Sequence, residues 1–467
     1  NSLRIGDGTI LIYPPGGVYE PPYLTFPLGA EPGRSEVTLV RLNQPAQCQP
    51  FVPTRARMGA ARQEVCAYWD DLLSRGARFS VPEERVMDAM RNLLVQNLFM
   101  TWRYSIGNAY ESWYPQESGD ALKVLGEFGF LDHYRENLQE LLPRVFRGKD
   151  ERPVEWANKL YYTAHYTLLS GDHSLMTDNQ DRMREWRVGL RKIMAEDPLG
   201  LLGKTRAGDI HTHCYYSHHQ ANGWRGLRDG AVACAEVGWQ KEAEDFAQAA
   251  AELRTSFVAA FNASKVDMPD GTLFWPKALT GSPATPYDPL TATRLGSYWN
   301  LSIGSALRSG IFDPRGDPPP PPVDYMLLHG AFFLGLTRFN YYPVPVGEVR
   351  DGGLPGYNTT GADNVYGLGI NEAMMEQDRA DRIVLGLYGK LAHGMTRGTF
   401  ISGEGDAFGP VPGEYHRSLY LPPSNTNNAL FLKTLHDMLV FNHIGAEGKP
   451  EELLLARDKI KESERQY

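Results

Sequence analysis

Three short turns decide the fold: Gly129-Phe130-Leu131-Asp132, Gly171-Asp172-His173-Ser174 and Gly238-Trp239-Gln240-Lys241. In each turn, a glycine follows one run of helix-spaced apolar residues, and a second such run begins directly after the turn. Glycine accepts the left-handed conformation that ends a helix, so turns of this kind join two antiparallel helices tightly. The turns therefore predict helices that come in pairs.

Outward from these turns, apolar residues at 3.6-residue spacing predict six helical pairs and a last helix. The expected pairs are 55–75 with 82–104, 121–129 with 132–146, 154–169 with 173–194, 223–237 with 239–261, 298–309 with 323–338, and 365–376 with 379–395, and the last helix covers 427–441. In the fifth pair, a run of prolines over 318–322 predicts a rigid spacer between the two helices.

The connections between the pairs are longer and rich in Gly, Pro, Asn and aromatic residues. They cover 106–120, 203–222, 340–362 and 398–426. If every second connection is short, all the long ones lie at one end of the helix array and can build one site. Six pairs that close on themselves form an all-α (α/α)6 toroid, and an open α-solenoid is the alternative. The unequal units and unlike loops favour the toroid, because solenoid repeats keep a fixed period.

The first 50 residues differ in composition from the rest. Proline and glycine crowd into 13–17 and 21–23, and a β-rich stretch follows over 36–42. A segment this short does not bury a core of its own. We therefore expect a β or extended segment over 1–50, either the remnant of a β-domain or a wrap on the helical body. The helical domain that carries the site is expected over 51–445, and a helical tail over 446–467.

Composition excludes several classes of protein. The 47 Lys and Arg residues against 56 Asp and Glu residues give a formal net charge of −9, with no basic cluster that would bind nucleic acid. No apolar stretch approaches the roughly 20 residues of a membrane span. The four cysteines form no C-x-x-C pair that would suggest a structural zinc or redox site. We expect no metal and no cofactor. The compartment in which the protein works is left open.

The long connection over 106–120 holds three acidic residues among aromatic ones. Glu111, Glu117 and Asp120 stand close to Trp113 and Tyr114, immediately before a predicted helix. Glycoside hydrolysis requires such a combination, because aromatic faces bind a sugar and an apolar setting lets one carboxyl group act as an acid. The alternative is that Asp120 caps the next helix and that Glu111 is solvated.

Two later connections add further acidic candidates. Glu404 lies between two glycines, which let the backbone bring a side chain close to a ligand, and Glu414 follows ten residues later. Both also fit surface turns. Asp363 ends a glycine-rich loop, where it either caps the following helix or contacts the substrate.

The connection over 203–222 and the start of the next helix are rich in histidine. His211, His213 and His218 lie within nine residues together with a fourth histidine, and Trp224 and Arg225 follow. The spacing matches no established zinc pattern, so a polar loop that faces a sugar is favoured over a metal site. Histidine and tyrosine side chains here would also suit the base and acid of a lyase.

The helical pairs and the segment Tyr114-Pro115-Gln116-Glu117-Ser118-Gly119-Asp120-Ala121 resemble the six-hairpin glycosidase superfamily, and within it the bacterial α-L-rhamnosidase-like enzymes. In that group, a Pro-Gln segment followed by acidic residues and Gly-Asp-Ala opens an inner helix and supplies the general acid. The resemblance implies that role for Glu117. The usual Arg-Asp-Glu run of the group is absent here, and Glu404 corresponds to its second carboxylate by order along the chain.

The resemblance and the loops together predict a glycoside hydrolase that cleaves a terminal bond of an oligosaccharide or polysaccharide, either an α-L-rhamnoside or a uronide. Glu117 would act as general acid and Glu404 as general base in an inverting mechanism, with Asp120 as a third catalytic residue. The expected substrate-binding residues are Glu111, Trp113, Tyr114, His211, His213, His218, Trp224, Arg225, Asp363 and Glu414. The alternatives are a polysaccharide lyase, which similar toroids also form, and a protein that binds glycans without catalysis.

Overall fold

The structure is a computed structural model, and it contains two compact units, Asn1–Gly76 and Ala77–Tyr467. It describes residues 2–5, 8–13, 16–27, 39–41, 54–100, 102–103, 113–148, 151–208, 210–282, 296–312, 323–339, 361–411, 414–444 and 450–455. No helix among these residues combines the length and the apolar character that crossing a membrane requires.

The first unit combines short strands with one helix. Strands β1 (Ser2–Ile5), β2 (Gly8–Ile12) and β5 (Val40–Arg41) form an antiparallel sheet, and β3 (Val18–Glu20) pairs with β4 (Tyr23–Thr25). The predicted short β segment is thus confirmed, although most of the β-rich stretch over 36–42 lies outside the described residues. Helix α1 (Arg55–Ser74) buries none of its side chains.

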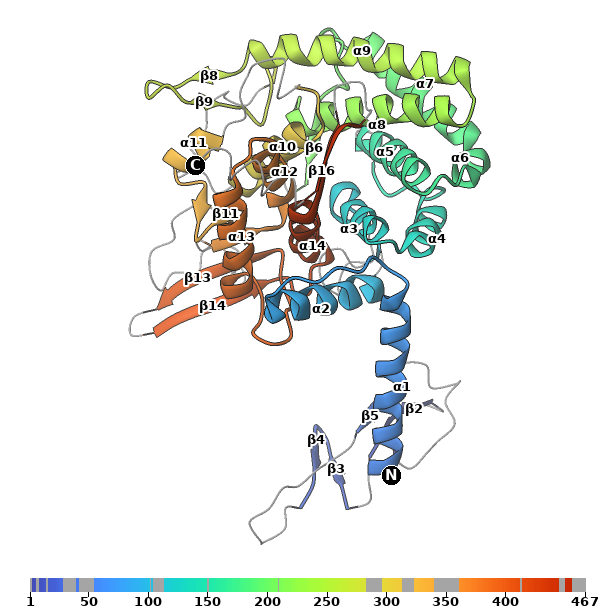
Figure 1. The fold of residues 1–467 in the computed structure, drawn as a ribbon, viewed down its shortest axis with the longest axis vertical. Helices are drawn as coiled ribbons and strands as arrows, with labels where there is room; N and C mark the ends of the chain where they lie inside the picture. The colour runs from blue at the N-terminus through green and yellow to red at the C-terminus, as the bar shows by residue number, and fades with distance from the viewer. Residues whose placement is uncertain are drawn as a thin grey trace. The chain divides into compact units, whose positions relative to one another are not determined.

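The second unit is a closed ring of six inner helices (Figure 1). They are α3 (Pro115–Glu127), α5 (Arg152–Ser170), α8 (Ser217–Glu236), α10 (Gly296–Arg308), α12 (Leu368–Glu376) and α14 (Asn425–Leu439). Each inner helix packs against the next one along the chain, and α14 packs against α3. This closure confirms the toroid and rules out an open solenoid.

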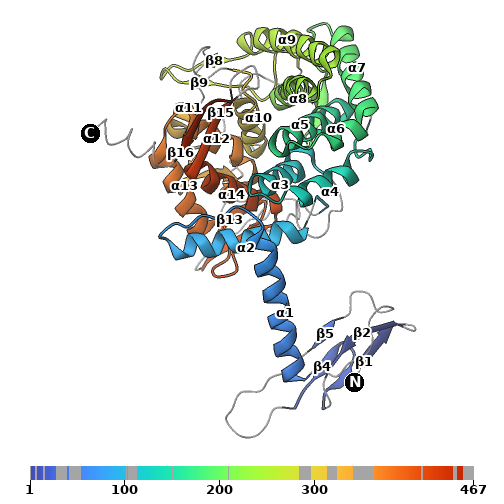
Figure 2. The ribbon, with the colours of Figure 1, turned by 45° about the vertical axis from the view of Figure 1, so that its right-hand side comes forward.

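A second layer of helices surrounds the ring (Figure 2). It consists of α2 (Glu84–Met100), α4 (Leu131–Leu141), α7 (Gln180–Glu196), α9 (Gln240–Asn262) and α13 (Ala380–His393), with the short helices α6 (Ser174–Asp178) and α11 (Val323–Leu328). Helix α2 packs against α14, α9 against α8, and α13 against α12. The predicted first pair, 55–75 with 82–104, is therefore wrong, because α1 belongs to the other unit and α2 covers α14.

The three turns quoted first have the predicted geometry. Gly129, Gly171 and Gly238 have φ angles of 89°, 70° and 84°, in the left-handed region. The Phe130 N–H donates to the Leu125 carbonyl at 3.0 Å, and the Trp239 N–H donates to the Cys234 carbonyl at 2.8 Å. Such bonds end a helix abruptly and start the next one. The long connections consequently lead into the N-terminal ends of the inner helices.

The sequence did not predict a five-stranded sheet in the second unit. Its strands follow the order β10 (Phe332–Phe333), β11 (Leu336–Phe339), β12 (Gly361–Asn364), β13 (Gly405–Val411) and β14 (Glu414–Tyr420). The helix predicted over 323–338 stops at Leu328, because Gly330 and Gly335 adopt positive φ angles that break it. Within the predicted helical tail, β16 (Pro450–Leu455) instead pairs with β15 (Val440–Ile444).

Three hairpin strand pairs and one short helical turn complete the secondary structure of the described residues. The pairs are β6 (Thr205–Ala207) with β7 (Ile210–Cys214), β8 (Val266–Asp267) with β9 (Leu273–Phe274), and the β15–β16 pair given above. The turn η3 (Val365–Gly367) is a 3₁₀ helix that leads directly into α12. Helix α3 begins at Pro115 rather than at the predicted residue 121, so the second half of the 106–120 connection is partly helical.

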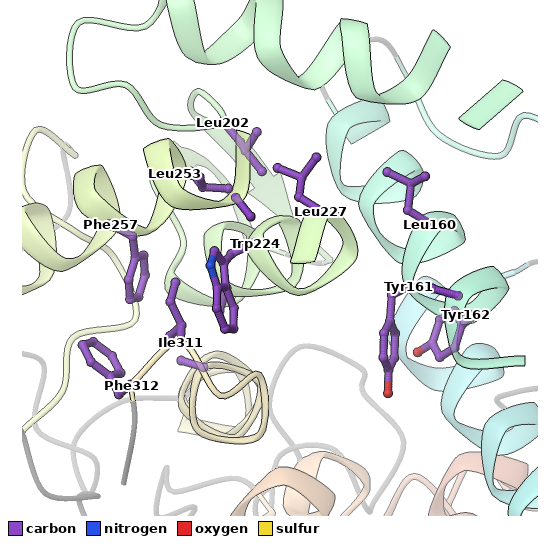
Figure 3. Packing of buried hydrophobic residues seen from close by; sticks show 14 of the residues in the cluster. Leu160, Tyr161, Tyr162, Leu202, Trp224, Leu227, Leu253, Phe257, Ile311 and Phe312 are labelled. Carbon is purple, nitrogen blue, oxygen red and sulfur yellow. The ribbon is translucent and has the colours of Figure 1, made fainter. Parts of the chain in front are cut away.

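Glycines let neighbouring inner helices approach closely. Large side chains of α5, α8 and α9 belong to one buried hydrophobic cluster, of which Figure 3 labels Tyr161, Trp224 and Phe257 on these three helices. On the other side of α8, a Cβ at Gly226 would lie only 2.2 Å from the Ala157 carbonyl oxygen of α5. A Cβ at Gly369 would lie 2.0 Å from a backbone oxygen of α10. Neither backbone contact can be relieved by moving a side chain.

Replacement of Gly226 or Gly369 by alanine is expected to lower the free energy of unfolding by about 3 kcal/mol, because two packed helices must separate. Urea denaturation of each variant measures this loss. Gly148→Ala is the matched control, since nothing lies within 4 Å of its added methyl group. Equal stability of G226A and G148A would contradict this account of the ring.

Candidate active site

A cavity of about 80 Å³ lies where the long connections enter the ring. Its walls come from the starts of α3, α5 and α8, from α10, and from η3. Its polar lining consists of Tyr114, Glu117, Arg147, Glu151, Arg206, His218, His219 and Tyr366. The expectation that one end of the toroid gathers the chemistry-bearing loops thus agrees with the position of this cavity.

Glu117 is the buried carboxylate of the cavity. It lies in the first turn of α3 and is 7% exposed. The Tyr366 hydroxyl donates a hydrogen bond to Glu117 Oε1 at 3.1 Å, which joins α3 to the segment before α12. Glu117 also lines a deeper space of about 20 Å³ together with Asp120, Val365 and Thr426. The carboxyl group is therefore held between the two spaces.

Asp120 lies one turn further along α3 and holds the ring together. It forms an ion pair with Arg308 of α10 at 2.7 Å and accepts a hydrogen bond from the Tyr162 hydroxyl of α5 at 2.9 Å. Burial, followed by the charge of Asp120, raises the pKa of Tyr162 well above its usual value. Since α3 begins at Pro115, Asp120 caps no helix, and its two partners belong to two other helices of the inner ring, α5 and α10.

Glu404 lies beside the wall of the deeper space. Its backbone carbonyl accepts a hydrogen bond from the Val365 N–H at 2.9 Å, and the neighbouring Gly403 carbonyl accepts one from Asn427 at 2.7 Å. These bonds anchor the Glu404 segment between η3 and α14. The half-buried Glu404 side chain is not among the described residues that line the two spaces.

The sequence did not single out Arg147 and Glu151, which line the same cavity as Glu117. Glu151 precedes α5, and its carboxylate lies 3.8 Å from the Arg147 guanidinium. The guanidinium carbon lies 4.9 Å from the centre of the Tyr114 ring. In the sequence, these two residues belong to a charged run over 147–152 that is typical of a solvated surface. Only the three-dimensional fold shows that they border the cavity.

Two buried histidines form the floor of the cavity. Burial lowers the pKa of His218 to about 3, and its Nδ1 lies 3.0 Å from the Ser302 hydroxyl. Burial also lowers the pKa of His219 well below its usual value, with further contributions from His218 and Arg147. Both imidazoles are therefore neutral near pH 7. His213 is exposed on β7, and the His211 side chain lies outside the described residues.

Two predicted substrate-binding aromatic residues belong to the core instead. Trp113 is fully buried, and its ring lies 5.7 Å from the Phe146 ring. Trp224 is buried under the guanidinium of Arg228, at 4.6 Å. Trp113 stands just before α3 and Trp224 lies two turns into α8, and for neither does the sequence alone distinguish core packing from ligand stacking. Of the rings expected at the site, Tyr114 lines the cavity.

Two predicted charged binding residues also have other partners. Arg225 stacks on Tyr161 at 4.2 Å, forms an ion pair with Asp229 at 3.6 Å, and faces the opposite end of the ring. Asp363 is buried in β12, where it pairs with Lys390 and accepts a hydrogen bond from Asn427 at 2.7 Å. Asp363 is also not the predicted helix cap, since four residues separate it from α12. Glu111 and the Glu414 side chain lie outside the described residues.

A second cavity, of about 230 Å³, lies at the short-turn end of the ring. Lys123 pairs with Glu127 at 2.8 Å, and Lys433 lies 3.8 Å from Glu127 and 3.9 Å from Glu372. Although burial alone would raise it, the pKa of Glu127 is lowered well below its usual value by Lys123 and Lys433. This axial charge cluster joins α3, α12 and α14 through mutually compensated ions.

No family model matches the sequence, and no curated protein matches it either. Among solved structures, a bacterial glucoamylase complexed with acarbose superposes with a TM-score of 0.57 and 11% identity. The match covers 86% of this chain and 62% of that one. The fold is therefore the helical-hairpin toroid of that enzyme.

Further matches have lower TM-scores. A wild-type glycosidase reaches 0.48, with 10% identity over 77% of this chain and 99% of that one. A metal-independent alpha mannosidase of Streptococcus pneumoniae also reaches 0.48, with 11% identity over 80% of this chain and 98% of that one. At such identities the likeness concerns the fold alone.

The neutral state of His218 predicts how stability depends on pH. Because the native pKa is about 3 and the unfolded value is about 6.5, the unfolded chain takes up a proton first as the pH falls. The contribution of neutral His218 to the free energy of unfolding is therefore fully present above about pH 6.5. Roughly 3 kcal/mol of this contribution is lost by pH 4. His218→Gln should flatten the pH dependence of the free energy of unfolding between pH 7 and 4. Ser302→Ala, the control, should lower stability at every pH and keep the slope.

Proposed function

We propose that the protein is a glycoside hydrolase that cleaves a terminal glycosidic bond with inversion at the anomeric carbon. The observation that carries the proposal is the position of Glu117, a buried carboxylate at the loop end of a closed helical ring, in a cavity shared with two tyrosines. Buried carboxyl groups next to aromatic side chains suit the acid of this reaction. The fold shared with a glucoamylase supports the same assignment.

In the proposed mechanism, Glu117 donates its proton to the glycosidic oxygen as the bond to the anomeric carbon breaks. Glu404 removes a proton from a water molecule, which attacks the anomeric carbon from the opposite face of the sugar. The Tyr366 hydroxyl, bonded to Oε1, orients the Glu117 carboxyl group. Asp120 stays ion-paired with Arg308 and positions the first turns of α3.

The proposed substrates are those expected from the sequence, an α-L-rhamnoside or a uronide of an oligosaccharide or polysaccharide. The Tyr114 ring lies at the cavity and provides an apolar face for the sugar. His218 and His219, which are neutral, offer hydrogen bonds to sugar hydroxyl groups at the floor. Glu151 is a second carboxylate of the cavity and the competing candidate for the general base.

A lyase is the second candidate function, and one observation favours it. Neutral His219 lies near the cationic Arg147, whose charge helps to lower the pKa of this histidine. A lyase would use such a pair, with the cation neutralising a uronate carboxylate while a base removes the adjacent proton. Arg225 cannot take the neutralising role at this site, because it lines the cavity at the opposite end.

Glu117→Gln and Glu404→Gln are each expected to lower kcat on aryl glycosides at least about 100-fold, since each removes one proton-transfer group. Stopped assays of aryl release measure the loss. Glu196→Gln, on the exposed face of α7, is the matched control and should keep wild-type turnover. Normal turnover in E404Q combined with a loss in Glu151→Gln would transfer the base role to Glu151 and contradict our assignment.

Hydrolysis and elimination leave different products. With a uronate-containing polysaccharide, the proposed hydrolase should release reducing ends without a new absorbance at about 235 nm, because hydrolysis creates no double bond. Ultraviolet absorbance and a reducing-sugar assay on the same sample measure both. Growth of the absorbance in step with the reducing ends, lost in His219→Gln, would instead establish the lyase.

A further inference from the structure

A buried ion pair fixes the backbone at one edge of the proposed active site. The Glu155 carboxylate accepts hydrogen bonds from the N–H groups of Phe146, at 3.2 Å, and Arg147, at 2.9 Å. Its partner Lys159 lies 2.7 Å away and donates to the Leu142 carbonyl at 3.2 Å. Glu155 and Lys159 are both almost fully buried on α5. The pair therefore holds both ends of the segment over 142–147.

Such a pair is a weak source of stability, because removing two ions from water costs about as much as their attraction returns. What it does provide is a fixed main chain, since the two side chains together form several bonds to one short segment. Arg147 is the last residue of this segment, and its side chain lines the cavity of Glu117. The fixed backbone thus places one guanidinium at the site.

The Arg147 guanidinium is oriented by contacts that do not use its N–H groups as hydrogen-bond donors. It stacks on Tyr114 at 4.9 Å, and its distance of 3.8 Å to Glu151 is longer than a hydrogen bond. No group within the described part of the chain accepts a hydrogen bond from it. A guanidinium that is held by stacking and by its backbone is pre-organised to bind two oxygens of one anionic group through two parallel hydrogen bonds.

From this arrangement we propose that Arg147 selects a substrate whose sugar carries an anionic group, a carboxylate or a sulfate ester, next to Glu117. Arg206, on β6, lines the same cavity. In the proposed mechanism Glu117 is the protonated acid, so Arg147 and Glu151 are the oppositely charged pair beside it. The inference rests on the proposed function and narrows its substrate class from neutral or acidic sugars to acidic ones.

Calorimetric titration at low salt with glucose, glucuronate and glucose 6-sulfate tests the selection without requiring turnover. At least one of the two anionic probes is expected to bind about tenfold more tightly than glucose, through a charge-assisted bidentate contact. Arg147→Gln should reduce that preference to less than about twofold and leave glucose binding unchanged. Arg147→Lys, which keeps the charge and loses the fork, should retain part of it.

Arg144→Gln is the matched control, because Arg144 lies in the same segment but its side chain is about half exposed and pairs with Glu140. This variant should keep the full preference for the anion. Equal binding of all three probes by the wild-type protein, or an unchanged preference in R147Q, would overturn the inference.

The experiments distinguish a failure of the anion selection by Arg147 from a failure of the proposed hydrolysis by Glu117. Loss of turnover in E117Q without an anion preference would leave the hydrolase standing and overturn the role of Arg147. An anion preference that depends on Arg147, combined with normal turnover in E117Q, would support the selection and overturn the assignment of the acid.

Discussion

The ring depends on the compensation of charges along its axis. Lys433 of α14, the last inner helix, reaches Glu127 of α3 and Glu372 of α12. Isolated ions in such a position would cost several kcal/mol each, so every one of them needs its partners in place. Arg308 links this charge cluster to the proposed active site. It lines the second cavity and also pairs with Asp120, which lies one turn from Glu117. The position of Glu117 is thereby tied to the closure of the ring.

Much of this architecture could be predicted from short-range signals. Gly129, Gly171 and Gly238 predict their turns, because glycine accepts such positive φ angles without strain. The five-stranded sheet could not be predicted, because the apolar residues over 332–339 fit the buried face of a helix and a strand equally well. The apolar spacing over 55–75 predicts a helix of the ring, but the sequence does not show that α1 buries none of its side chains.

The site was harder to predict than the fold. Glu117 could be found because a carboxylate stands among aromatic residues at a helix start. Arg147 and Tyr366 could not be found, because their importance comes from contacts between loops that are far apart along the chain. Residue type alone predicts Trp113 and Arg225 at the site. The prediction is wrong because the direction of a side chain depends on packing that the sequence does not show.

Closure through α14 also determines when the ring can form during synthesis. The α14 helix that packs against both α2 and α3 is the last inner helix to leave the ribosome. Until then Glu127 of α3 lacks Lys433, and the apolar sides of α2 and α3 that α14 covers remain open to solvent. Domains of this size commonly pass through such partly folded states, which are prone to aggregation. A nascent chain of this protein is therefore most exposed to chaperones and proteases just before α14 emerges.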